Sequence, residues 1–283
     1  MDFRKILDKL KWKPEKEYSF SLPDTDKQQN NEYFPDKNLN FPKEVFSSIN
    51  KNLDYIKVRF NTLINTDIVI REFVLNACGK NYNSFLLFID GMVDSNLISD
   101  FVLKPLMRNN ISNCQPNIIE EKKINNVTIR KIKKVDLSDF LYNNLLPQNN
   151  VSKKSNFDAI VSSVNSGNCI LFVDSLNIAF DIEVKGFKQR SVDSPNNEVV
   201  IKGPQEAFVE NIRTNTSLLR RIVNSEKLII ENVEIGDITK TKCSICYLEN
   251  ISNSDLVAEI KFRISNLDID SLLSSRSIGG THY

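Results

Sequence analysis

The sequence predicts an α/β fold of two similar strand–helix subdomains, with mixed sheets, packed side by side. The first observation is FLLFIDG at 85–91, an apolar run that ends in a turn and precedes SNLISDFVLKPLM, in which apolar residues have helical spacing. The second is NCILFVDS and AFDIEVKG, which repeat the strand character in the second half. The third is an ungapped alignment of LFIDGMVDSNLISDF (87–101) with CYLENISNSDLVAEI (246–260), which suggests related halves. Strand, turn and helix in that order are typical of layered α/β domains.

The composition divides the chain into four parts. Residues 1–45 mix prolines, charges and amides without an apolar period, which predicts a flexible arm. We expect one α/β subdomain over 46–150, a second over 151–275, and a short tail over 276–283. A second alignment, of NTDIVIREF (65–73) with NTSLLRRIV (215–223), also suggests that the two subdomains are related.

In the first subdomain, VFSSINKNLDYIKVRF from Val45 to Phe60 spaces its apolar residues as an amphipathic helix does. A short segment, TDIVIREFVL, follows it. The region 108–150 is polar and broken, although NVTIRKIKKVDL has the character of one more strand.

In the second subdomain, apolar and charged residues alternate in AFDIEVKG, which predicts a strand with one buried and one solvated face. KLIIENVEIGDITKTKCSICYLEN predicts a hairpin that turns at Gly236 and Asp237. NSDLVAEIKFRISNL then predicts a closing helix capped by Asn253 or Ser254.

The bulk properties exclude several classes of protein. The 283 residues carry 37 basic and 36 acidic groups, and this balance argues against a nucleic-acid partner. No window approaches 18 consecutive apolar residues, and the N-terminus lacks a signal-peptide pattern. The five cysteines are odd in number and scattered, so we expect reduced thiols in a cytosolic compartment.

The sequence has few residue patterns that are typical of catalytic sites, so we expect that the protein is not an enzyme and binds no cofactor or metal. The one histidine, His282, lies at the end of the chain, so an internal histidine base is excluded. Cys243 and Cys246 have CxxC spacing, but no second ligand pair accompanies them. Asp90 and Asp174 each end an apolar strand, where α/β proteins place functional carboxylates. The alternative function is therefore small-molecule binding in a cleft between the subdomains, near Asp90, Gly91 and Asp174.

The stretch KGPQEAFVENIRTNTSLLRRIV combines a glycine and a proline with several charged residues. Gly203 is expected to end a strand, Pro204 to begin a helix, and Glu206 to lie at its positive end. The predicted apolar face holds Phe208, Ile212, Leu219 and Ile222, and Arg213, Arg220 and Arg221 fall largely outside it. Those arginines fit either a solvated helix surface or a docking surface for carboxylates.

The same stretch resembles the A-subunit family of bacterial spore germinant receptors, the GerA family. The family pattern R-S-x-x-x-P-x-x-E-x-x-x-x-G-P-x-x-x-F-x-E, followed by R-T-N-x-x-L-x-R-R, fits VKGFKQRSVDSPNNEVVIKGPQEAFVENIRTNTSLLRRIV. The likeness covers about residues 50–272. From this pattern and the charges near it, we predict a partner interface made of Arg190, Ser191, Pro195, Glu198, Gly203, Pro204, Glu206, Glu210, Arg213, Thr214, Asn215, Arg220 and Arg221.

The resemblance implies the N-terminal cytosolic region of a multi-pass protein of the inner spore membrane. It implies a signalling and assembly role in nutrient-triggered germination, with the B and C subunits of the receptor as partners and other A subunits as further candidates. The membrane would be reached through a C-terminal part absent from this chain.

Overall fold

The computed structural model describes residues 43–108, 117–124, 127–133, 136–186, 206–267, 269–270 and 272. In chain order the elements are α2 (Ile49–Arg59), β1 (Ile68–Ala77), β2 (Lys80–Ile89), α3 (Ser95–Ile98), α4 (Lys104–Met107), β3 (Asn117–Ile124), β4 (Val127–Lys133), α5 (Leu137–Phe140), β5 (Val151–Lys154), α6 (Phe157–Asn165), β6 (Cys169–Val173), β7 (Ala179–Ile182), α7 (Ile212–Ile222), β8 (Leu228–Ile235), β9 (Thr241–Leu248) and α8 (Ser254–Ser265). A π-helical turn, Ser99–Leu103, joins α3 to α4, and a second, Leu141–Leu145, follows α5.

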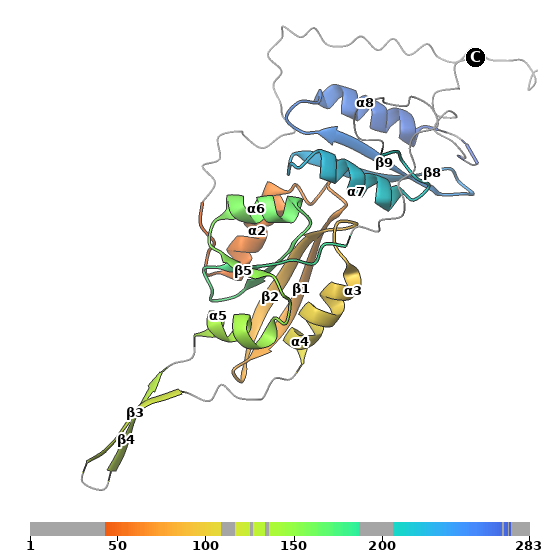
Figure 1. Ribbon diagram of the computed structural model, residues 1–283. Helices are drawn as coiled ribbons and strands as arrows, with labels where there is room; N and C mark the ends of the chain where they lie inside the picture. The colour runs from red at the N-terminus through yellow and green to blue at the C-terminus, as the bar shows by residue number, and fades with distance from the viewer. Residues whose placement is uncertain are drawn as a thin grey trace, which may run out of the picture.

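Five strands form one sheet in the order β1-β2-β6-β7-β5, and helices cover both of its faces (Figure 1). One apolar cluster joins α2 and α6 to the sheet, with Ile56, Phe157 and Phe172 among its fully buried members. The other joins α3, α4 and α5 to the opposite face. We call this three-layer body, built from residues 43–108 and 136–186, the sheet unit.

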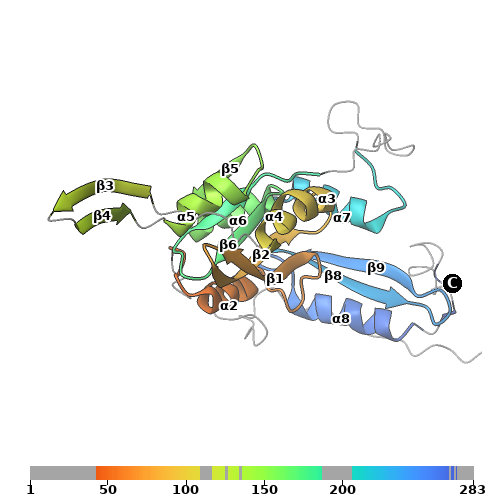
Figure 2. The same cartoon turned by 90° about the horizontal axis from the view of Figure 1, so that it is seen from below.

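Helices α7 and α8 and strands β8 and β9 form a smaller body, residues 206–272, which we call the C-terminal unit. Its strands β8 and β9 pair as a hairpin, and Gly236 follows β8 with a φ of 89°, which glycine tolerates at a tight turn. Helices α7 and α8 lie on opposite sides of this hairpin (Figures 1 and 2). In both views the β3–β4 hairpin lies apart from the two units.

Several predicted elements are confirmed. The helix at 49–59, the buried strand at the end of β2, the strand β4 and the hairpin β8–β9 all form where the sequence places them. Helix α8 begins as predicted, with the Asn253 side chain accepting hydrogen bonds from the amides of Asp255 and Leu256. The α/β character of the fold is also confirmed.

Three details differ from the prediction. Every described strand pair is antiparallel, so the expectation of mixed sheets is wrong. The sheet also takes strands from both sides of residue 150, so the predicted boundary there divides a single sheet. Finally, the segments 65–73 and 215–223 do not match, because the first leads into a strand and the second is helical.

The predicted solvated face of β7 is wrong at Asp181. Strand β7 is paired at both edges, and helices cover both faces of its sheet, so each of its residues is buried. The Asp181 carboxylate accepts hydrogen bonds from Ser163 Oγ and Asn168 Nδ2, both at 2.8 Å. These partners replace water around the buried charge.

Candidate functional site

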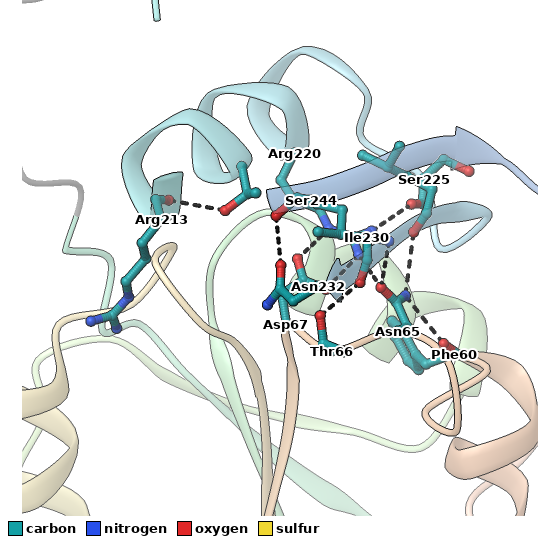
Figure 3. A network of polar contacts seen from close by, with 12 residues as sticks. Phe60, Asn65, Thr66, Asp67, Arg213, Arg220, Ser225, Ile230, Asn232 and Ser244 are labelled. Carbon is teal, nitrogen blue, oxygen red and sulfur yellow. Dashed lines mark hydrogen bonds and ion pairs between the residues drawn. The ribbon is translucent and has the colours of Figure 1, made fainter. Parts of the chain in front are cut away.

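A buried ion pair joins the two units. Arg220 of α7 donates from Nε to Asp67 Oδ2 at 2.8 Å and from Nη2 to Asp67 Oδ1 at 2.7 Å, a two-pronged contact that fixes the guanidinium plane (Figure 3). Its Nη2 also donates to Asn65 Oδ1 at 2.9 Å. The Arg220 side chain is 1% exposed and that of Asp67 is 8% exposed. Each charge therefore depends on the other for its stabilisation.

The residues just before Asp67 bind the edge of β8. Thr66 donates from its amide and its hydroxyl to the Ile230 carbonyl, both at 2.9 Å. The Ile230 amide donates to Asn65 Oδ1 at 3.0 Å, and Asn65 Nδ2 reaches the Leu228 carbonyl at 3.3 Å (Figure 3). We call Asn65, Thr66, Asp67, Arg220 and Ile230 the polar joint.

Local capping directs α7 toward this joint. Asn211 ends the preceding segment, and its Oδ1 accepts from the amides of Arg213 and Thr214 at 3.0 and 3.3 Å. Asn215 binds both the amide and the carbonyl of Val209, at 2.8 and 2.7 Å. This pair of bonds holds the segment before the helix against its first turn.

A second ion pair lies at the start of α7. Arg213 pairs with Asp90, which follows β2, and both side chains are nearly half exposed. Beside them Gly91 has a φ of 85°, and a Cβ there would lie 3.1 Å from the Arg213 carbonyl oxygen. Gly91 thus permits both the turn and the close approach of α7.

Two hollows flank these contacts. One, of about 80 Å³, lies between the units and is lined by polar groups that include Asp67, Asp90, Thr216 and Ser244. The other, of about 350 Å³, lies between the starts of α3 and α7, and its lining includes Asn96 and Thr214. Among the described residues, no three His, Cys, Asp or Glu side chains gather as a metal site.

The structure changes the prediction for α7 itself. The helix begins at Ile212, not at Pro204, because Asn211 caps it there. Phe208 and Ile222, expected on the buried face, are 65% and 72% exposed. The buried side chains of α7 are mostly polar, because this helix faces the polar joint: Thr216, Ser217, Leu218 and Arg220.

The prediction that Arg220 lies on an exposed helix face is therefore wrong. Arg221, its neighbour, is about one-third exposed and pairs with Glu206 at 2.7 Å. Glu206, Glu210, Arg213, Thr214 and Asn215 also lie in the described chain, in or just before α7. The other predicted interface residues lie outside the described residues: Arg190, Ser191, Pro195, Glu198, Gly203 and Pro204.

The predicted cleft is not a single site. The Asp174 amide donates to the Asn83 carbonyl near the start of β2, whereas Asp90 follows the end of β2. Asn83 and Asp90 are seven positions apart along the strand, which is about 23 Å. Asp174 instead accepts from the Ile49 amide at 3.1 Å and so caps α2.

The cysteines show no sign of an activated thiol in the described chain. Cys243 and Cys246 both lie on β9, and burial raises the pKa of each thiol. Asp67 raises the pKa of Cys246 further, and Arg220 lowers it. Cys78 is disulfide-bonded, so the expectation of five reduced thiols is wrong at that residue.

Asn65 and Thr66 could not be predicted as joint residues, because their partners lie about 165 positions away in the chain. A polar stripe on α7 was the one available signal. Thr216, Ser217 and Arg220 occur at helical spacing, as an inward polar face requires.

Comparisons with known proteins agree with one another. The family model described as "Bacillus/Clostridium GerA spore germination protein" matches residues 54–281. Spore germination protein KA of Bacillus subtilis (strain 168) is 26% identical over 234 residues, which are 83% of this chain and 39% of that protein. Stage V sporulation protein AF of the same strain is 32% identical over 228 residues, 81% of this chain and 41% of that protein. The chain thus spans about two fifths of the length of these relatives.

A solved structure extends the likeness to the fold. The crystal structure of the N-terminal domain of the A subunit of the Bacillus megaterium spore germinant receptor GerK3 matches with a TM-score of 0.55 and 27% sequence identity. The match covers 83% of this chain and 78% of that one. No helix in the described part of the chain has the length and apolar character to cross a membrane. With the family model matching most of its length, the chain belongs to the GerA family of spore germination proteins and corresponds to the N-terminal domain of a germinant receptor A subunit.

Proposed function

We propose that this chain is the signalling and assembly domain of a germinant receptor A subunit, at the cytosolic face of the inner spore membrane. Its partners would be the B and C subunits, with other A subunits as further candidates, and its contribution to nutrient-triggered germination would be conformational. The observation that carries this proposal is the match to the N-terminal domain of the GerK3 A subunit.

The exposed charges around α7 support a docking role. Glu206 and Arg221 pair at 2.7 Å with about one-third of each side chain exposed, and Arg213 and Asp90 are nearly half exposed. Arginines held on a capped helix present planar donors to a partner's carboxylates. Phe208, beside them, is 65% exposed and adds apolar area to the same region.

Charge reversal at Arg221 tests the assembly role. In the organism that encodes this chain, the full-length protein with Arg221→Glu should retain its abundance but recover less of the B and C subunits on purification. Nutrient-triggered germination should slow in parallel. Normal recovery of both partners together with normal germination would refute the role of this surface.

A small-molecule site is the second candidate, favoured by the hollow of about 350 Å³ between α3 and α7. Its volume falls in the range of ligand pockets. Polar side chains line much of it: Asp94, Ser95, Asn96, Asn211, Arg213 and Thr214. Calorimetric titration of the chain with amino acids, sugars and nucleosides separates the two candidates. Micromolar binding that is lost in Thr214→Val would favour the ligand site, whereas no heat from any nutrient would reject it.

A further inference from the structure

The two units are joined by polar contacts without a shared apolar core. Both apolar clusters of the described chain are made of residues between Val45 and Val184, all in the sheet unit. The hydrogen bonds and ion pairs between the units are those of the polar joint, Arg213 with Asp90, Arg59 with Glu226 at 3.0 Å, and Asn61 with Glu249 at 3.2 Å. Interfaces of this polar kind permit relative motion more readily than apolar ones.

A single stretch of the polypeptide chain connects the two units. The C-terminal unit follows the sheet unit through residues 187–205 alone, so a single covalent connection joins two bodies whose other contacts are non-covalent. Among those contacts, the Arg220–Asp67 pair is the most deeply buried.

We propose that the polar joint is a conformational latch. In its closed state Arg220 binds Asp67 and Asn65, and Thr66 binds the edge of β8. In its open state these bonds are exchanged for water, and the C-terminal unit separates from the sheet unit while both remain folded. The latch is a property of the chain itself, so it stands or falls independently of the receptor partners proposed above.

The surroundings of the joint suit such an exchange. The hollow of about 80 Å³ beside it is lined by Asp67, Asp90, Thr66 and Ser244, and a polar space of this size admits water. Water that enters there reaches the carboxylates of both ion pairs. Opening therefore leaves no charge without a polar partner.

Adjacent arginines provide a matched pair of variants. Arg220→Met removes the buried guanidinium while keeping a long apolar chain, and it leaves Asp67 without its charged partner. Arg221→Met makes the same change one position later, where the side chain pairs with Glu206 inside the C-terminal unit. Because both variants replace arginine by methionine in α7, they change its helix propensity equally. They differ mainly in that Arg220→Met removes contacts of the polar joint.

Amide hydrogen exchange of the 283-residue chain, followed residue by residue by NMR, reports on the latch. The amides of Thr66 and Ile230 donate across the joint. The amides of Asp174 and Glu249 donate within the sheet unit and within the C-terminal unit, respectively. In Arg220→Met, exchange at Thr66 and Ile230 should accelerate by about 100-fold or more, because a buried carboxylate has lost its partner. Exchange at Asp174 and Glu249 should stay close to that of the unaltered chain.

Each other outcome overturns the proposal. Equal acceleration at all four amides would mean that the pair stabilises one cooperative fold with no separate opening. No acceleration at Thr66 and Ile230 would mean that the pair does not hold the joint. Acceleration of the same size in Arg221→Met would assign the effect to α7 in general. If Arg220→Met does not fold, the milder Asp67→Asn is measured in the same way, and its failure to fold would also refute a folded open state.

Discussion

Replacing Gly91 by alanine should destabilise the chain more than the same change at Gly79, for a reason that can be worked out from the two sites. Gly79 has a φ of 70° in the β1–β2 turn, and a Cβ there would meet nothing within 4 Å. Gly91 has a φ of 85°, and a Cβ there would lie 3.1 Å from Arg213 O and 3.2 Å from Arg213 Cγ. Both variants place an L-side chain in the left-handed region, at a cost of about 1–2 kcal/mol. Only Gly91→Ala also presses on the backbone of α7, which adds about 1–3 kcal/mol.

Urea unfolding followed by circular dichroism measures the difference. The free energy of unfolding should fall by about 1–2 kcal/mol in Gly79→Ala and by about 2–5 kcal/mol in Gly91→Ala. Since Arg213 O belongs to α7, the Gly91 variant should also accelerate amide exchange at Thr66 and Ile230, across the joint. Equal losses of stability in the two variants would refute the close approach of α7 to Gly91.

Three further predictions concern other parts of the fold. Asn253→Ala removes the cap of α8 and should lower the free energy of unfolding by about 1 kcal/mol, measured by urea unfolding; an unchanged value would mean that the cap contributes nothing. Burial raises the pKa of the thiol of Cys169, which should therefore resist a thiol reagent in the folded chain and react only on unfolding, whereas the exposed Cys246 should react first. The pKa values of Cys169 and Tyr55 are both raised in the folded chain, so above about pH 9 the unfolded state releases protons that the folded state retains. The free energy of unfolding should therefore be at its full value below that pH and fall as the pH rises through it. Urea midpoints at pH 7 and pH 10 would check this, and an equal midpoint at both would contradict it.

Local signals in the sequence were sufficient for much of the fold. The β8–β9 hairpin could be predicted because its turn carries Gly236 and its strands are rich in β-branched residues. The start of α8 could be predicted because asparagine before an apolar period is a strong capping signal. Both features depend on residues that are close in sequence.

The arrangement of the strands could not be predicted in the same way. Strand β2 pairs with β6, more than 80 residues later, and the alternation within β7 gave no sign that α6 covers the face that carries Asp181. For that reason Asp181 was expected in solvent. Its partners, Ser163 and Asn168, come from α6 and the loop after it, and local periodicity carries no information about them.

The different environments of Arg220 and Arg221 could not be predicted from the sequence motif that contains them. Consecutive residues of an α-helix point about 100° apart, so one arginine of the pair faces the sheet unit when the other faces outward. The sequence alone could not decide which, because the usual guide, an apolar inward face, does not apply to α7. Of its inward polar residues, Arg220 bonds to Asn65 and Asp67, whereas the hydroxyls of Thr216 and Ser217 donate to carbonyls of α7 itself. In this chain the two successive arginines therefore have different environments: Arg220 is buried in the joint, and Arg221 is about one-third exposed beside Glu206. If the proposed assembly role holds, variants at the two positions should separate opening of the joint from assembly.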